Sequence, residues 1–511
     1  MSSCRRKRAR GFRLAPLAAA LALAYAGAAA AAEPFQAVMP AKRIPGEHVG
    51  VAALMHALQA VGVKPRPPSP VPAAILSVTT CADDNSSGSL RSVVAVAGEG
   101  DTLDLSKLSC SVITLSQGAI QVRLDELSVV AAGADRMAID GAGTDRVFVH
   151  YGNGTLSLAG MTVRNGAAIV SGYHITGGAC IISAGYVTLD HSTVSGCRSE
   201  GEGAYGGGVL ARSLTLSTSI ISGNVALGSH PDTFTAAYGG GGFAYAGTAL
   251  LYDSSVTGNR ATFNSTDTHG SYDVGGGIFS DGGGYALRST IEGNYSYGTG
   301  GGIGSRGGFS LADCTISGNT AKAKGGGGIF VRLFDTMAVS NSTIAHNSAF
   351  KGGGMYVSGI PQGFTMQSTI VADNVATIGA ADIASQSALT VSGANNLIIA
   401  ADVTVALPAD TLHVEPLLLP LANNGGPTRT HALGVGSPAL DAGNNIANLP
   451  TDQRGAAFPR VLGARADIGA IEGALPPPPI AAVPSVSAWL LALLAGALAW
   501  LGLSWLRPHR R

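Results

Sequence analysis

A short pattern of alternating aliphatic and polar residues recurs along the chain between residues 187 and 376. The copies return roughly every 25 to 35 residues, a spacing typical of solenoid proteins. Three residues before the end of most copies stands Val or Ile, and five residues before it stands Ser or Cys. These two positions share one face of an extended strand, because side chains alternate along it. The residues that close the copies are Cys197, Asn224, Asn259, Asn294, Asn319, Asn347 and Asn374.

The pattern predicts an all-β fold built from stacked coils. The copies are rich in Thr, Ser, Val and Ile, which favour strands, and each is too short to form a propeller blade of its own. Asn and the glycine runs that follow most copies accept the left-handed backbone that a sharp corner requires. Asparagines at one corner of every coil also predict a ladder of amide hydrogen bonds with a structural role. We therefore predict a right-handed parallel β-helix, a solenoid, over residues 77–394.

The flanking segments predict export and membrane attachment. Residues 1–32 have the basic start, apolar stretch and small-residue end of a signal peptide, and residues 33–76 are a leader with a Pro-rich linker. A short helix from Leu90 is predicted to cover the first coil. Residues 395–473 form a Gly- and Pro-rich C-terminal cap region, and residues 474–485 are a Pro-rich spacer with a sorting motif. Residues 486–511 are predicted as a transmembrane helix with a basic cytoplasmic tail.

Three stretches carry family resemblances. Residues 88–93 (GSLRSV) resemble the CSLREA-type segment at the start of many bacterial β-helix surface proteins. Residues 424–428, 437–441, 452–455 and 467–472 resemble the choice-of-anchor Q domain, and we expect Asp452, Arg454, Arg460 and Asp467 to tie its loops together. The tail resembles the IPTL-CTERM class of sorting signals through the residues Val483, Pro484, Ser485, Val486 and Trp489.

These resemblances imply a surface protein of a Gram-negative bacterium. The expected partners are a signal peptidase and an exosortase-type transpeptidase, which would cut near residues 483–486. The repeats themselves are similar to those of polymorphic outer-membrane proteins and pectate-lyase-like β-helices. A plain C-terminal membrane anchor is the alternative to the sorting signal. In either case, the solenoid is expected to face away from the cytoplasm, in the envelope or outside the cell.

Charge and cysteine content narrow the picture further. The chain has 32 basic and 32 acidic residues, so no overall field attracts nucleic acid. An oxidising compartment favours disulfides, and we predict a Cys81–Cys110 bond that fastens the N-terminal region to the first coils. The pairing of Cys180 and Cys197 is left open, because they stand at different points of the coil. Cys314 occupies the serine column and is expected to be a buried free thiol.

Two coils are longer than the others and are predicted to project side by side from one edge. Their aromatic and carboxylate side chains would suit a glycan or matrix ligand. The alternative is that they are solvated loops, and no spacing of their histidines matches a metal site. The candidate ligand-binding residues are His230, Asp232, Phe234, Tyr238, Asp267, His269, Tyr272 and Asp273.

An outward-facing column six residues before the closing residue offers the strongest candidate for chemistry. It places Asp253, Arg288 and Asp313 in successive coils about 4.8 Å apart on an exposed strand face. Acids and a base on such a face are found in polysaccharide lyases and hydrolases, and paired carboxylates could also bind Ca²⁺. The alternative is a surface row of ion pairs. No other cofactor or metal is predicted.

We interpret the chain as an adhesin-like surface protein that binds glycan or matrix. An enzyme of the lyase or hydrolase class and a purely structural surface or biofilm component remain as alternatives. An enzyme would require acid and base residues that converge in a groove, and the sequence shows only the single row at Asp253, Arg288 and Asp313. The fold alone decides nothing, because solenoids serve many functions.

Overall fold

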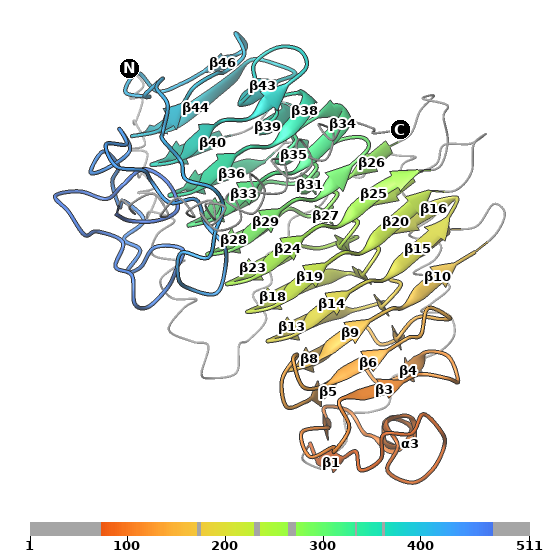
Figure 1. Ribbon diagram of the computed structural model, residues 1–511. Helices are drawn as coiled ribbons and strands as arrows, with labels where there is room; N and C mark the ends of the chain where they lie inside the picture. The colour runs from red at the N-terminus through yellow and green to blue at the C-terminus, as the bar shows by residue number, and fades with distance from the viewer. Residues whose placement is uncertain are drawn as a thin grey trace, which may run out of the picture. The chain divides into compact units, whose positions relative to one another are not determined.

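The computed structural model describes residues 73–170, 175–228, 236–263, 272–332, 335–359 and 363–473. Parallel strands stack on one another into a right-handed β-solenoid of about 11 turns (Figure 1). Every pairing between consecutive coils is parallel, as the repeat predicts. One full coil runs through β13, β14, β15, β16 and β17, and each of these strands belongs to a different sheet.

We name the five sheets A to E in the order in which one coil visits them. The A sheet has 13 strands: β1 (Ile75–Ser77), β2 (Thr102–Asp104), β5 (Leu127–Val130), β8 (Thr155–Ala159), β13 (Tyr186–Asp190), β18 (Ser213–Ser217), β23 (Ala249–Tyr252), β28 (Gly284–Leu287), β32 (Phe309–Ala312), β36 (Thr336–Ser340), β40 (Gly363–Gln367), β44 (Leu389–Ala394) and β46 (Val405–Ala406). The B sheet has 11: β3 (Val112–Thr114), β6 (Ala138–Asp140), β9 (Thr162–Arg164), β14 (Thr193–Ser195), β19 (Ile220–Ser222), β24 (Ser255–Thr257), β29 (Thr290–Glu292), β33 (Thr315–Ser317), β37 (Thr343–Ala345), β41 (Ile370–Ala372) and β45 (Leu397–Ile398).

The remaining three sheets complete the coil. The C sheet has eight strands: β10 (Ala167–Ile169), β15 (Arg198–Gly201), β20 (Val225–Gly228), β25 (Arg260–Phe263), β30 (Tyr295–Ser296), β34 (Thr320–Gly325), β38 (Ser348–Lys351) and β42 (Val375–Ala376). The D sheet has four: β11 (Ile175–Gly177), β16 (Gly203–Tyr205), β21 (Ala236–Tyr238) and β26 (Tyr272–Val274). The E sheet has ten: β4 (Ile120–Val122), β7 (Phe148–His150), β12 (Ile181–Ser183), β17 (Val209–Ala211), β22 (Gly242–Ala244), β27 (Ile278–Ser280), β31 (Ile303–Ser305), β35 (Ile329–Arg332), β39 (Met355–Ser358) and β43 (Ile383–Ser385).

The predicted inward columns form the core. The aliphatic column is fully buried, and the serine column lies inside beside it. The backbone N–H of Ser192 donates to Ser219 Oγ at 3.1 Å, and Ser219 N–H donates to Ser254 Oγ in the same way. The serine column therefore links one coil to the next as well as filling space. The members of the aliphatic column are Val194, Ile221, Val256, Ile291, Ile316 and Ile344.

The asparagine ladder is confirmed. From Asn224 to Asn374, each Nδ2 donates to Oδ1 of the next asparagine at 2.9–3.0 Å. The same Oδ1 atoms accept a backbone N–H from the preceding coil. The ladder begins at the backbone N–H of Cys197 and ends where Asn374 Nδ2 donates to Asp382 Oδ1 at 2.9 Å.

Both pairs of cysteines at the N-terminal half are bonded. The predicted Cys81–Cys110 disulfide is confirmed, and Cys180 is bonded to Cys197. The strand register explains the second bond. Ile181 pairs with Val209, so Cys180 occupies the column of Gly208, the glycine that packs against Asn224 in the next coil.

The Cys180–Cys197 bond therefore replaces the Asn–Gly contact of the other coils. The sequence analysis left this pairing open, because the two cysteines stand at different points of the coil. It did not predict that these two columns lie against each other in the interior. Cys314 is buried and free, as expected, and burial raises the pKa of its thiol to about 12.

The short helix predicted from Leu90 is present as α3 (Leu90–Val96), at the end of the stack near β1 in Figure 1. Ser89 caps it by accepting the N–H of Ser92, and Leu90, Val93 and Val94 join the solenoid core. In the part of the chain that the structure describes, no helix is long and apolar enough to cross a membrane. The predicted signal peptide, sorting motif and transmembrane helix lie outside that part, as does the predicted leader up to residue 72. The last residues of the predicted leader instead belong to the solenoid, because β1 begins at Ile75 and pairs with β2.

Residues 407–473, which we call the C-terminal segment, contain turns and isolated bridges but no named helix or strand. This segment lies against the outer face of the B sheet. Gln453 Oε1 accepts from Thr315 Oγ1 at 2.6 Å, and the backbone N–H of Ala470 donates to Thr343 Oγ1 at 3.1 Å. Ile468 packs with Ile370 in a separate small apolar cluster. The B sheet is therefore buried on both faces where the segment covers it.

Candidate ligand-binding groove

The column that carries Asp253, Arg288 and Asp313 lies at a corner of the coil, which corrects our placement of it on an exposed strand face. Each member follows an A-sheet strand and has a positive φ of 44–49°. This conformation is uncommon for residues other than glycine. The serine column holds the corner closed, because each serine Oγ donates to the carbonyl two residues before it, as Ser219 does to Ser217 at 2.8 Å. The corner residues are His191, Thr218, Asp253, Arg288, Asp313 and Asn341.

The three candidate residues do not form one continuous charge ladder. Arg288 binds Asp253 through two contacts, Nε to Oδ1 at 2.7 Å and Nη2 to Oδ2 at 2.6 Å. Asp313 instead pairs with Arg460 of the C-terminal segment, at 3.3 Å between Oδ1 and Nη1. Arg288 and Asp313 are both buried. The C-terminal segment therefore shields the corner column from solvent at Arg288 and Asp313.

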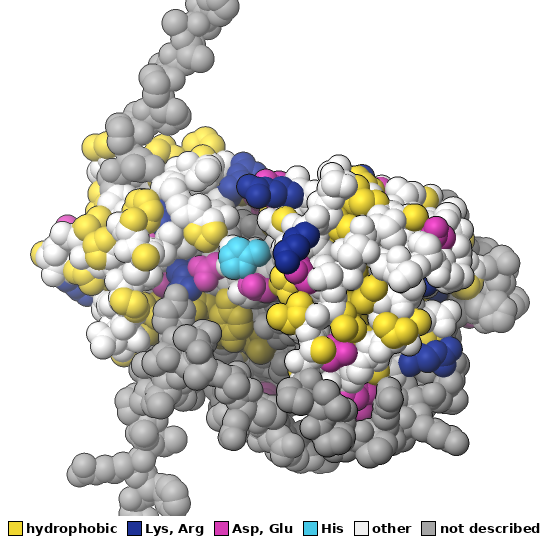
Figure 2. Space-filling view, turned by 90° about the horizontal axis from the view of Figure 1, so that it is seen from below, with side chains coloured by type: hydrophobic (Ala, Val, Ile, Leu, Met, Phe, Trp, Pro, Cys, Tyr) yellow, Lys and Arg dark blue, Asp and Glu magenta, His cyan; other side chains and the backbone are white. Residues whose placement is uncertain are grey.

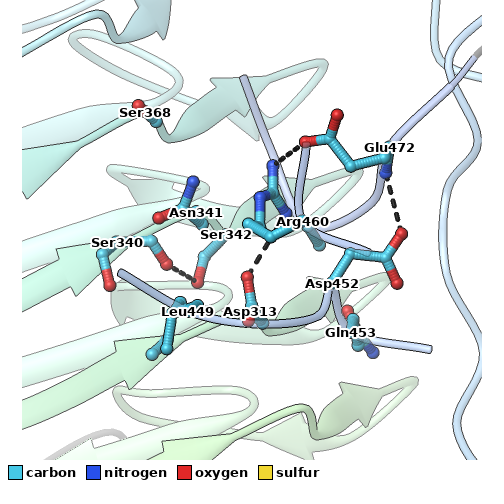
Figure 3. A network of polar contacts seen from close by, with 12 residues as sticks. Asp313, Ser340, Asn341, Ser342, Ser368, Leu449, Asp452, Gln453, Arg460 and Glu472 are labelled. Atoms are coloured by element: carbon cyan, nitrogen blue, oxygen red, sulfur yellow. Dashed lines mark hydrogen bonds and ion pairs between the residues drawn. The ribbon is translucent and has the colours of Figure 1, made fainter. Parts of the chain in front are cut away.

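Figure 3 shows how this buried network continues. Arg460 Nη2 lies 2.8 Å from Glu472 Oε1 and also donates to the Asp467 carbonyl at 2.8 Å. The backbone N–H of Glu472 donates to Asp452 Oδ2 at 2.9 Å, and Asp452 in turn binds Arg454. All four residues that we expected to tie the loops together thus lie in this network.

Carboxylates outnumber guanidinium groups in the network. The carboxylates are those of Asp253, Asp313, Asp452, Asp467 and Glu472, and the guanidinium groups are those of Arg288, Arg454 and Arg460; backbone N–H groups such as that of Asp441 supply further donors. Burial raises the pKa of Asp313 to about 8 and that of Glu472 to about 7. Burial thus disfavours the charged form of both acids, whereas the neighbouring Arg460 favours it. On the surface of the molecule, Figure 2 shows histidine, basic and acidic side chains close together on one face.

The raised pKa values of Asp313 and Glu472 predict that the protein loses stability as the pH rises from about 7 to about 9, a range above that in which His431, whose pKa burial lowers to about 4, acts in the opposite direction. An unfolded chain loses these protons near pH 4, whereas the folded protein keeps them until the pH passes about 7 or 8. The folded state thus binds more protons across this window, so the free energy of unfolding falls as pH rises. Asp382, whose pKa burial raises to about 6, acts in the same direction.

Urea unfolding at about pH 7 and about pH 9 checks this prediction. We expect a higher urea midpoint at the lower pH. The difference between the two midpoints should be smaller in an Asp313→Asn variant, because the asparagine side chain is neutral at both pH values. A midpoint that rises with pH would contradict the assignment of protons to these acids.

A groove of about 630 Å³ opens between the corner that follows the B sheet and the C-terminal segment. Its floor includes Gly258 and Gly293, where an added Cβ would meet nothing within 4 Å. These glycines have a positive φ of 60–63°, so the corner itself favours residues without a side chain. The groove is lined by Thr257, Gly258, Glu292, Gly293, Ser317, Gly318, His346, Leu418, Pro420, Leu421, Arg429 and His431.

An ion pair crosses the groove. Arg429 Nη1 lies 3.1 Å from both carboxylate oxygens of Glu292, and its Nη2 donates to the Leu421 carbonyl at 2.8 Å. Half of the Arg429 side chain is exposed, whereas Glu292 is mostly covered. The pair therefore offers a fixed donor and acceptor to a ligand without adding net charge.

Two histidines stand beside this pair. His431 Nδ1 lies 2.8 Å from the Leu419 carbonyl, which makes it the protonated nitrogen, so Nε2 accepts from Ser317 Oγ at 2.8 Å. Burial lowers the pKa of His431 to about 4, so its ring is neutral. His346 is exposed, and its ring centroid is 4.9 Å from that of His431. His346 occupies the corner position that is glycine in the preceding coils and Asp373 in the next one, with a φ of 58°.

Sequence reasoning missed this groove. Glu292 and Arg429 are 137 residues apart, and Ser317 and His431 are 114 apart. The available signals were weak: Glu292 is a charged residue in a column of small side chains, and His346 replaces a corner glycine.

The strands that flank the two long insertions lie side by side, because β20 pairs with β25 and β21 pairs with β26, and most of each insertion (residues 229–235 and 264–271) lies outside the described residues. Tyr238, however, is buried against Tyr205 and Phe279, with ring centroids 5.3 and 5.1 Å away. Its proposed contact with a ligand is therefore wrong, because the D sheet packs its aromatic rings against the E sheet. Tyr272 and Asp273 lie in β26. The other candidates, His230, Asp232, Phe234, Asp267 and His269, lie outside the described residues.

Comparison with solved structures gives a likeness at low sequence identity. The crystal structure of pectate lyase Pel9A is similar with a TM-score of 0.40 and 14% sequence identity, over 79% of this chain and 97% of that one. No family model and no curated protein matches the sequence. Within the described ranges, no group of three His, Cys, Asp or Glu side chains is arranged to hold a metal ion.

Proposed function

We propose that this chain is a secreted β-solenoid, displayed on the envelope of a Gram-negative bacterium, that binds a neutral glycan in the groove. The groove is the observation that carries the proposal. Its volume of about 630 Å³ falls within the range of small-molecule sites, roughly 300–1,000 Å³. It is held between two parts of the chain that are fixed to each other by buried hydrogen bonds. The site is therefore preformed, which limits the entropy lost on binding.

The lining suits a sugar without charge. Arg429 and Glu292 neutralise each other but keep polar atoms directed at the groove, and His346 adds an exposed imidazole. Leu418 and Pro420 supply apolar surface for the C–H faces of a sugar ring. A few placed polar groups in an otherwise apolar wall are typical of ligand pockets.

Export and display rest on separate support. The Cys81–Cys110 and Cys180–Cys197 disulfides suit an oxidising compartment. The signal-like residues 1–32 and the resemblances to choice-of-anchor Q and IPTL-CTERM tails favour delivery to the envelope. In this proposal, an exosortase-type transpeptidase acts near residues 483–486.

Calorimetric titration of the full-length protein with a panel of soluble neutral oligosaccharides tests the groove. We expect one ligand class to bind and an Arg429→Ala variant to lose about tenfold in affinity, because a hydrogen bond to a charged group is removed. Arg465→Ala is the matched control, since Arg465 is exposed on the same segment and lies outside the groove.

Two outcomes would contradict the proposal. Equal affinity in both variants would remove the groove from the binding site. Release of new sugar ends during the titration would redirect the function toward the lyase or hydrolase alternative.

A further inference from the structure

The outer face of the C sheet carries a strip of basic and aromatic side chains on successive coils. Arg260, Lys322 and Phe350 are exposed on this face, whereas Tyr295 and Tyr297 are half-buried between them. We call these five residues the C-sheet strip. They lie in or directly beside β25, β30, β34 and β38, which are neighbours in the sheet. With coils about 4.8 Å apart, the strip extends for about 14 Å along the solenoid axis.

The strand register brings cations and rings together. Arg260 is the direct partner of Tyr295, and its guanidinium carbon lies 4.2 Å from the ring centroid. Ser296 pairs with Ala321, so Lys322 stands opposite Tyr297, with Nζ 5.6 Å from that ring. These cation–π contacts hold the Arg260 guanidinium and the Lys322 ammonium group in position with little loss of their hydration. Phe350, in the next coil, is 41% exposed.

Charge is segregated on this face. The five strands β20, β25, β30, β34 and β38 contain no Asp or Glu, but they contain Arg260, Lys322, Lys324 and Lys351. The chain as a whole has equal numbers of acidic and basic residues. Among the residues that the structure describes, two carboxylates pair with basic side chains at the margins of these strands. Glu200 in β15 pairs with Arg198 at 2.7 Å, and Asp402 pairs with Lys351 at 3.4 Å. The face between them therefore has a local surplus of positive charge.

We propose that the C-sheet strip binds a linear anionic polysaccharide that runs along the solenoid axis. Its carboxylates meet Arg260 and Lys322, which are spaced two coils apart, and one sugar ring lies on the exposed face of Phe350. A regular polymer matches a regular array of coils, because both repeat at fixed intervals along one direction. This site is distinct from the groove in position and in the charge of its ligand.

A single-stranded nucleic acid is a weaker fit to the same surface. Such polymers bind through bases that stack in succession on open aromatic rings. Arg260 and Lys322 already lie over Tyr295 and Tyr297, which leaves Phe350 as the exposed ring of the strip. The strip thus favours charge contacts with carboxylates and a single stacking contact.

Fluorescence anisotropy with labelled alginate oligomers and the full-length protein tests the proposal. We expect binding that weakens as salt is added, because the contacts are between exposed charges. A double variant, Arg260→Glu with Lys322→Glu, should bind about tenfold more weakly. The matched control is Lys107→Glu with Arg136→Glu, which makes the same change in net charge at exposed sites elsewhere and should stay within about twofold. Phe350→Ala should weaken binding without altering its dependence on salt.

Equal losses in the two double variants would overturn the proposal, as would equal binding of labelled dextran, which is neutral. Tighter binding of a single-stranded oligonucleotide than of alginate would assign the strip to a different polymer. Arg429→Ala is expected to leave alginate binding unchanged, so the strip and the groove succeed or fail separately.

Discussion

Replacing Asn294 with alanine is expected to lower the free energy of unfolding by about 3–5 kcal/mol. Asn294 Oδ1 accepts from both the backbone N–H and Nδ2 of Asn259, and its own Nδ2 donates to Asn319 Oδ1 and to the Val256 carbonyl. Alanine leaves all four partners buried without this amide, and each unsatisfied buried group costs about 1–3 kcal/mol. No water can easily replace it, because Asn294 is 1% exposed.

The position of Asn294 also predicts how unfolding changes. A solenoid is stabilised by contacts between neighbouring coils, so a defect in the middle of the ladder weakens the coupling between its two halves. We expect the thermal transition of the variant to broaden or split when followed by circular dichroism. Asn423→Ala is the control, since Asn423 is exposed and its amide oxygen accepts one hydrogen bond, from Gly425 N–H. A loss below about 1 kcal/mol at Asn294 would show that the ladder is not a major stabilising feature.

Replacing Arg460 with methionine is expected to cost about 3–5 kcal/mol and to loosen the C-terminal segment. Arg460 is almost fully buried and contacts Asp313, Glu472 and the Asp467 carbonyl. Methionine fills most of the same volume, so the main loss is the positive charge that both acids share. Removing one partner of a buried ion pair is costly because the other partner stays out of water.

Limited proteolysis and urea unfolding separate the local effect from the global one. We expect cleavage within residues 407–473 to become faster in the Arg460→Met variant while the solenoid core stays resistant. Arg465→Met serves as the control, because Arg465 is exposed nearby. A variant with unchanged proteolysis and unfolding would show that the buried network does not hold the segment in place. The loss of stability in the variant should be larger at about pH 9 than at about pH 7, because Asp313 and Glu472 then lose their protons without the Arg460 charge beside them.

The sequence predicts part of the corner column and does not predict the groove. The spacing of Asp253, Arg288 and Asp313 in successive coils was read correctly, and Arg288 does bind Asp253. The partner of Asp313 lies 147 residues further on, in a stretch without repeats. The left-handed backbone of the corner was also missed, because Thr and Arg seldom adopt it.

The sequence by itself determined the coil of this protein. In a solenoid, residues that touch are those at equivalent positions of consecutive repeats, so a column read from the sequence is a column of contacts in space. The buried aliphatic column, the serine column and the asparagine ladder all follow from that rule.

The tertiary structure alone decided what covers the coil. Residues 407–473 return across the B sheet through contacts that join Thr315 to Gln453 and Asp313 to Arg460, which have no periodic relation. That return buries Arg288 and Asp313, pairs Ser317 with His431 and creates the groove, because only a folded chain brings a non-repeating segment against a repeating surface.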